Sequence, residues 1–300
     1  AGSHLEMPTT GGDSDLELVR AVQADRISES QLDIRVDEIL DVILPVTKAI
    51  HDQDGKPFDV EKHHEMAARA CAESIVLLKN ENDILPLQKG AQVAVIGEFA
   101  QKARYQGAGS SVVNPTRLDN AIDVIGGFGL NVAGFEPGYP RSGPGDPELR
   151  RKAVELAQKA EIVLLYIGLD EISESEGLDR THMRLPQSQI DLLDAVSAVN
   201  SNVVAVMSAG SAVEMPWLPK CKALVHGYLC GQAGASSVLK VILGELNPCG
   251  KLAESYPLKY EDVPSAPYFP SKQRSAEYRE GLYVGYRYYE TANIPVLFPF

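Results

Sequence analysis

The sequence predicts an α/β protein, a three-layer α/β/α sandwich with a mostly parallel sheet that begins near residue 60. Its strand-like segments are almost continuously apolar, as in Gln92–Gly97, Ile162–Ile167 and Val203–Met207. Continuous apolar strands are typical of a sheet that is covered on both faces. Helical segments separate these strands, which favours parallel pairing through right-handed crossovers.

The part before residue 60 is predicted to contain a helix and a linker. Ser28 and Gln31 form a capping-box pattern at the start of the helix. Apolar residues then recur at helical spacing, namely Leu32, Val36, Ile39, Leu40 and Ile43. This spacing predicts a helix over 29–44, which Pro45 ends or kinks. Residues 51–58 have the composition of a linker.

From residue 60 onward, helices and strands are expected to alternate. Asp146 followed by Pro147 is an N-cap with proline at the first helical position. The predicted helices cover 60–80, 115–125, 146–159, 186–199 and 231–243. The predicted strands cover 92–97, 131–133, 162–167, 203–207 and 223–227.

Composition excludes some classes of partner. The chain has 300 residues, 44% of them hydrophobic and 23% charged, and its net charge is −13. This acidic balance argues against binding to nucleic acid or to an anionic membrane. No apolar run approaches the ~20 residues of a membrane span. No signal peptide is visible, so a cytoplasmic location is expected.

Cysteine and histidine do not form a metal-binding pattern in the sequence. The four cysteines, Cys71, Cys221, Cys230 and Cys249, are scattered in the sequence, which favours buried reduced thiols over a zinc site. The sequence leaves the possibility of a disulfide open. His63 and His64 lack the second histidine of a zinc-binding helix, because Ala68 occupies that position. We interpret both as surface histidines and predict neither a metal nor a cofactor.

Three loops that follow strands carry the candidate chemistry: Tyr105–Ser111, Glu174–Arg180 and Ser208–Ala212. Loops at the carboxyl ends of parallel strands lie at one edge of the sheet, where ligands collect. The carboxyl groups of Glu174 and Glu176 could donate or accept a proton there. The alternative is that both are solvated and inert, with Asp179 and Arg180 as a structural ion pair.

The glycine-rich run Gly107–Ser111 has two interpretations. Its glycines allow a ligand to approach the backbone closely. A phosphate cradle for a nucleotide is one possibility, although no lysine follows the glycines as in a Walker motif.

Several blocks resemble the C-terminal domain of family 3 glycoside hydrolases, the β-glucosidases and their relatives. The match extends in the right order over nearly the whole chain. The blocks are Ala72–Glu81 with Leu85–Leu87, Gln106–Ser111 with Asn114 and Pro115, Glu176–Arg180 with Leu185 and Pro186, Asn247–Pro257, and Tyr278–Tyr289.

This resemblance implies an active site built by two domains. A (β/α)8 barrel supplies an aspartate nucleophile, and the α/β sandwich supplies the general acid/base glutamate. That glutamate is best matched by Glu176, directly before Gly177, and Glu174 is the second choice. The cleft for the sugar or aglycone is then bordered by Gln106, Gly107, Gly109, Ser110 and Ser111. Retaining hydrolysis places the two carboxyl groups ~5–5.5 Å apart, and the acid needs a raised pKa.

The chain also departs from the family pattern. Residues 1–8 resemble the end of the barrel, with His4 where an acidic residue is usual, and a complete barrel takes ~250 residues. We therefore expect residues 1–58 to be the C-terminal remnant of the barrel plus linker, and residues 59–300 to be the sandwich. The chain alone is then expected to be inactive, with the missing barrel domain as its partner.

The resemblance leaves the substrate open. A β-linked glucoside is the leading expectation, and a xyloside, an N-acetylglucosaminide or a glycosylated natural product are alternatives. Surface that normally packs on the barrel would be exposed, which favours a homo-oligomer. The competing hypothesis is a noncatalytic module of the same fold that binds sugar or a protein.

Overall fold

The computed structural model describes residues 2–53 and 57–300. Contacts within the chain divide it into two units, Ala1–Asp59 and Val60–Phe300. The first unit contains helices α1, Asp13–Gln23, and α2, Glu29–Asp52. The predicted capping box starts α2, because the Ser28 hydroxyl accepts the N–H of Gln31 and the Gln31 side chain accepts the N–H of Ser28.

Helix α2 corrects two expectations. It continues through Pro45 to Asp52 instead of ending there, because proline removes one backbone hydrogen bond and the following residues resume the helical pairing. The predicted linker over 51–58 therefore starts inside the helix, and its residues 54–56 lie outside the described part. Among the described residues, no helix is long and apolar enough to cross a bilayer. Helix α2 has no buried residue, and its exposed apolar side chains are Ile34, Val36, Leu40, Val42, Ile43, Leu44, Val46 and Ile50.

The second unit is built on a six-stranded sheet with the order β1-β6-β5-β4-β2-β3. Only the pair formed by β1 and β6 is antiparallel, and the other neighbouring strands are parallel. This mostly parallel sheet confirms the predicted fold class. The strands are β1 Val76–Asn80, β2 Gln92–Ile96, β3 Asn131–Glu136, β4 Ile162–Gly168, β5 Val203–Ser208 and β6 Ala223–His226.

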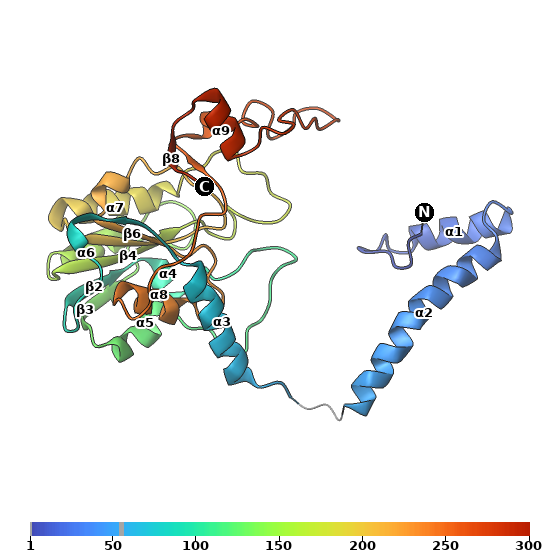
Figure 1. Ribbon diagram of the computed structural model, residues 1–300, viewed down its shortest axis with the longest axis horizontal. Helices are drawn as coiled ribbons and strands as arrows, with labels where there is room; N and C mark the ends of the chain where they lie inside the picture. Colours follow the sequence, from blue (N-terminus) through green and yellow to red (C-terminus); the bar gives the residue numbers. More distant parts are fainter. Residues whose placement is uncertain (1, 54–56) are drawn as a thin grey trace. The chain divides into compact units, whose positions relative to one another are not determined.

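Helices cover both faces of this sheet, as Figure 1 shows for α7 on one side and α5 and α8 on the other. The helices are α3 Val60–Ser74, α4 Glu98–Gln101, α5 Ala121–Val124, α6 Pro147–Ala157, α7 Gln187–Val199, α8 Gly234–Ile242 and α9 Tyr286–Ala292. Two short strands, β7 Tyr256–Pro257 and β8 Val296–Phe298, pair with each other apart from the main sheet.

Strand β4 lies between two hydrophobic cores, which explains why its sequence is continuously apolar. Val163, Leu165 and Ile167 belong to the core that includes residues of α6 and α7, whereas Leu164 and Tyr166 belong to the core that includes residues of α8. Successive side chains of a strand point to opposite faces, so a sheet with two covered faces needs apolar residues at every position.

Two predicted helices are wrong in extent. The helix expected over 60–80 ends at Ser74, and Val76–Asn80 forms the edge strand β1 beside β6. The helix expected over 115–125 is reduced to Ala121–Val124. The backbone N–H of Asp119 donates to the carbonyl oxygen of Gln232 at 2.9 Å, which ties the preceding residues to another segment and takes that donor out of a helix.

Candidate active site

The three predicted loops meet at the carboxyl edge of the sheet. The strand ends that precede two of them are in direct contact, because the N–H of Leu169 donates to the carbonyl oxygen of Ser208 at 2.9 Å. Gly168 makes this approach possible, since a Cβ there would lie 1.8 Å from the same oxygen. The sequence therefore places glycine where two chain segments are closest.

Glu174 is held firmly between these loops. Its carboxylate accepts the backbone N–H of Gly210 at 2.8 Å and the hydroxyl of Ser211 at 2.7 Å. Its side chain is 18% exposed. A carboxylate with two donors in fixed positions is well suited to joining loops, because hydrogen bonds to a charged group are the stronger kind.

The buried side chain of Arg104 holds the same segment in place, a role that was not predicted from the sequence. Its side chain is 1% exposed, and its Nη2 atom lies 3.9 Å from the Glu174 carboxylate. The guanidinium donates to the carbonyl oxygens of Leu169 and Glu174 at 3.2 and 3.1 Å. Two basic residues, Lys102 and Arg104, lie shortly before the glycine-rich run, and nothing in the sequence distinguishes the one that is buried.

Glu176 is exposed and lies against the glycine-rich loop. Its carboxylate accepts the backbone N–H of Ser110 at 2.6 Å, and its own N–H donates to the Ala108 carbonyl oxygen at 3.4 Å. Gly109 gives it room, because a Cβ there would lie 2.6 Å from the Cβ of Glu176. The structure thus brings Glu176, Gly109 and Ser110 together as the sequence predicts.

The local hydrogen bonds lower the pKa of Glu176. The Ser110 hydroxyl has the largest effect, followed by the Ser110 backbone N–H, since both stabilise the ionised carboxylate. The sequence led us to expect a raised pKa. The opposite direction arises because Glu176 here faces hydrogen-bond donors instead of an apolar or anionic surface.

The other residues of the glycine-rich loop mainly shape it. Gln106 binds the backbone of Val113 through both ends of its side-chain amide, at 2.9 and 3.0 Å. The Ser111 hydroxyl lies close to Gly107, where a Cβ would be 2.7 Å away. Because the Ser110 N–H already serves a carboxylate, this loop is a poor cradle for phosphate, which argues against the nucleotide interpretation.

Arg180 has a different partner from the one expected. Its Nη1 donates to the Ser211 hydroxyl at 2.6 Å, and in the described part of the chain it forms no ion pair with Asp179. Burial lowers the pKa of Arg180, against the opposing effect of the Glu174 and Glu254 carboxylates. Its Nη2 atom is buried and has no hydrogen-bond partner among the described residues.

Histidine and cysteine require two corrections. The cysteines are not all buried, because Cys230 is half-buried and Cys249 is exposed. His64 is not on the surface but buried, with its ring nitrogens 2.9 Å from the Gln232 amide and 3.4 Å from the Asp119 carboxylate. It faces inward because it lies on the side of α3 that packs on α8. Within residues 2–53 and 57–300, no group of histidine, cysteine and acidic residues is arranged to hold a metal, and all four cysteines are free thiols.

Comparison with protein-family models assigns the chain to a family. Residues 75–286 match the model described as the glycosyl hydrolase family 3 C-terminal domain. The chain belongs to glycoside hydrolase family 3. The family model thus covers both Glu174 and Glu176 and most of the sandwich.

Individual family 3 proteins are similar over the whole chain. Thermostable beta-glucosidase B of Acetivibrio thermocellus is 45% identical, matching 100% of this chain and 40% of its own length. An exo-alpha-(1->6)-L-arabinopyranosidase of Bifidobacterium breve is 42% identical, matching 100% of this chain and 41% of its own length. The chain thus spans about two fifths of the length of these curated relatives.

A solved family 3 structure has the same fold. The GH3 beta-glucosidase of Bifidobacterium adolescentis superposes with a TM-score of 0.88 at 41% identity, over 99% of this chain and 44% of the other. The chain is therefore the C-terminal α/β domain of this family together with the segment that precedes it.

Proposed function

We propose that this chain supplies the general acid/base, Glu176, to a retaining, exo-acting β-glucosidase-like hydrolase. The observation that supports it best is the contrast between two neighbouring carboxylates. The Glu174 carboxylate accepts hydrogen bonds from Gly210 and Ser211. The Glu176 carboxylate is exposed and, in the described part of the chain, accepts hydrogen bonds from Ser110. A group that transfers protons to a substrate has to be reachable.

The reaction assigns Glu176 two steps. As an acid it protonates the oxygen of the leaving group, and afterwards as a base it takes a proton from the water that releases the sugar. The nucleophile is a second carboxylate that lies in the longer protein. A carboxylate ~5–5.5 Å away disfavours the ionised form of Glu176 and raises its pKa. That effect opposes the hydrogen bonds from Ser110.

The substrate class is a β-linked glucoside or a related glycoside. Two relatives of similar identity are named for different sugars, a β-glucosidase and an α-L-arabinopyranosidase. We propose that the choice between such sugars is made largely by residues beyond this chain, because the site described here contributes mainly proton transfer and loop contacts.

A chimera tests this proposal. The chain replaces the matching 40% of thermostable beta-glucosidase B, and hydrolysis of an aryl β-glucoside is measured. Glu176→Gln is expected to lower kcat/KM by ~10²–10⁴-fold, the usual contribution of general acid–base catalysis. Glu174→Gln is expected to cost less, and the chain alone to be no faster than buffer.

The matched control is Glu148→Gln, which removes an exposed carboxylate on α6 whose ion-pair partners among the described residues, Arg151 and Lys152, lie on the same helix. Its kcat/KM should equal that of the unmodified chimera. A larger loss from Glu174→Gln than from Glu176→Gln would contradict the assignment, and turnover by the isolated chain would contradict the need for a second carboxylate.

A further inference from the structure

One face of helix α3 carries a buried thiol that the proposed proton transfer does not use. His64, Ala68 and Cys71 are spaced by four and three residues, which places them on the same side of the helix. Cys71 is 5% exposed and belongs to the core that includes residues of α8. The surroundings of this thiol are therefore set by the elements that pack on this face of α3.

The start of helix α8 and the residues before it cover this face. The Gln232 side-chain amide lies 2.9 Å from a ring nitrogen of His64. One turn farther along α3, the Ser237 hydroxyl donates to the Ala68 carbonyl oxygen at 2.9 Å. These two hydrogen bonds hold the segment against α3, and Cys71 is the next residue of the same face.

A second thiol, that of Cys230, lies in this covering segment. Its side chain fills the space that two glycines leave open, since an added Cβ would lie 2.5 Å from its Sγ at Gly227 and 2.3 Å from its Cβ at Gly234. The thiol donates to the Gly227 carbonyl oxygen at 2.7 Å, and the side chain packs against the core that contains Cys71. The Cys71 and Cys230 thiols are hydrogen bonded to each other. The fold thus brings together two cysteines that are far apart in the sequence.

The hydrogen bond between the two thiols makes their ionisation unequal. Cys230 lowers the pKa of Cys71 against the opposing effect of burial, and Ser237 acts in the same direction as Cys230. The same contact, together with burial, raises the pKa of Cys230 well above its ordinary value. Because the thiolate is the nucleophile in thiol chemistry, Cys71 is the better suited of the two to attack an oxidant.

A small hollow beside Cys230 leaves room for an oxidant. It has a volume of about 40 Å³, and Gly231, Gly234 and Val238 also line it. One water molecule needs ~10–15 Å³, so a molecule of the size of hydrogen peroxide fits into this space. Cys230 itself is half-buried.

We propose that Cys71 and Cys230 are a redox pair that hydrogen peroxide converts into a disulfide. The Cys71 thiolate attacks one oxygen of the peroxide, which forms an S–O bond, breaks the O–O bond and releases hydroxide. The hydroxide takes up the proton that Cys71 lost and becomes water. The Cys230 sulfur then attacks the sulfur of this sulfenic acid, the S–O bond breaks, and the leaving oxygen takes the Cys230 proton as a second water. Two thiols are oxidised to one disulfide, and one peroxide is reduced to two waters.

This disulfide ties α3 to the segment that adjoins the glycine-rich loop. In that segment the Gly231 N–H donates to the Tyr105 carbonyl oxygen at 2.9 Å. A cross-link between distant positions restricts the unfolded chain, so the oxidised protein is expected to be more resistant to urea than the reduced one.

Peptide mapping of the purified 300-residue chain tests the pair. The reduced chain is treated with hydrogen peroxide, the remaining thiols are alkylated in urea, and the peptides are identified by mass spectrometry. We expect the Cys71 peptide to be linked to the Cys230 peptide with the loss of two hydrogen atoms, and Cys221 and Cys249 to be alkylated. The midpoint of urea unfolding should rise on oxidation and return on reduction.

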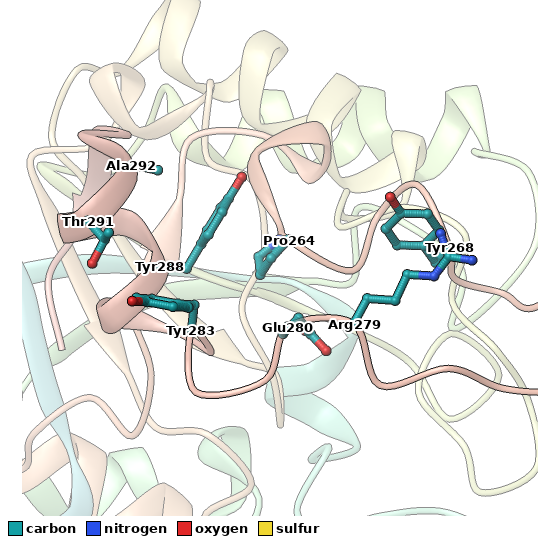
Figure 2. A pocket seen from close by; sticks show the side chains of 8 residues that line it. All are labelled: Pro264, Tyr268, Arg279, Glu280, Tyr283, Tyr288, Thr291 and Ala292. Atoms are coloured by element: carbon teal, nitrogen blue, oxygen red, sulfur yellow. The ribbon is translucent and has the colours of Figure 1, made fainter.

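The hollow along the C-terminal loop provides an internal control for unselective oxidation. Figure 2 shows its lining, which contains Tyr268, Tyr283 and Tyr288 and, among the described residues, no cysteine. Its volume is about 390 Å³, so it admits peroxide at least as easily as the hollow beside Cys230. Peptides with these tyrosines should keep their mass, and their oxidation at the same peroxide dose would contradict the selectivity of the pair.

Cys249→Ser is the matched control variant, because it removes an exposed thiol and leaves the pair intact. It should give the same cross-link and the same rise in the urea midpoint, whereas Cys230→Ser should abolish both. The inference is overturned if Cys71 and Cys230 are both recovered as alkylated peptides, or if either is linked to Cys249. An equal rise in the urea midpoint of the Cys230→Ser variant on oxidation would also overturn it.

Discussion

The loop Glu174–Arg180 has an anchored base at Glu174 and an exposed tip at Glu176, and the two regions differ in burial and in hydrogen bonding. At the base, Arg104 and Glu174 are shielded from water and bonded to several segments. At the tip, Glu176 is exposed, and its carboxylate and backbone N–H form hydrogen bonds with the glycine-rich loop. Two residues of the same type, two positions apart, thus have opposite surroundings.

For the proposed role of Glu176, this difference means that the carboxylate is held by a rigid neighbour while it stays exposed itself. The base transmits the rigidity of the sheet to the loop through buried charge-assisted hydrogen bonds. The tip leaves the Glu176 carboxylate exposed, as the proposed proton transfer to a substrate requires. Changes at the base should therefore alter stability, and changes at the tip should alter ionisation and catalysis.

Replacing the buried Arg104 should have the largest effect on stability. Arg104→Met leaves the Leu169 and Glu174 carbonyl oxygens without a donor and Glu174 without its nearest cation. We expect the free energy of unfolding to fall on the order of 3 kcal/mol, as when one partner of a buried charged network is removed. Urea denaturation measures it. Arg151→Met, on the exposed face of α6, should leave the stability almost unchanged, because exposed ion pairs contribute little.

Alanine substitutions of Glu174 and Glu176 should differ in their effect on the free energy of unfolding. Glu174→Ala removes the acceptor of the Gly210 N–H and the Ser211 hydroxyl, and we expect a loss of ~1–3 kcal/mol. Glu176→Ala should leave the free energy of unfolding almost unchanged, as is usual for surface substitutions. Equal losses in urea denaturation would mean that the base and the tip are not distinct.

Two glycines with nearly the same φ angle test how closely Glu176 packs against the glycine-rich loop. Gly109 has φ +86° and Gly143 has φ +87°, but only at Gly109 would a Cβ meet Glu176. Both alanine variants should lose ~1 kcal/mol from the left-handed conformation. Gly109→Ala should also displace Glu176 and raise its pKa, seen by carboxyl NMR titration, whereas Gly143→Ala should leave that pKa unchanged.

The smallest expected change concerns ionisation alone. Ser110→Ala removes the hydroxyl that contributes most to the lowered pKa of Glu176, so the pKa should move up toward its ordinary range. In the parent chain this interaction adds stability above the unfolded-state pKa of ~4.3, and the contribution is lost as pH falls through the folded-state pKa. The variant should show a weaker loss of stability on acidification, and an unchanged titration would refute the role of Ser110.

The sequence predicted the sheet well because its signal is local. Strands such as Ile162–Gly168 are apolar at every position, and Asp146 with Pro147 marks the start of α6 as expected. It failed where a distant segment determines the local structure. Val76–Asn80 continues a helical pattern in sequence but becomes β1 because β6 offers it a free edge. His64 is buried because α8 lies against its helix, which no local pattern of α3 reveals.

The sequence alone was sufficient for the family, the α/β sandwich, and the loops that carry Glu174, Glu176 and the glycine-rich run, since all of these depend on residue order and local propensity. The tertiary structure alone determined which glutamate is anchored and which is exposed, because the donors on Arg104, Gly210 and Ser211 come from distant parts of the chain. Long-range contacts of this kind form only when the strands are in register, and no residue carries that information by itself.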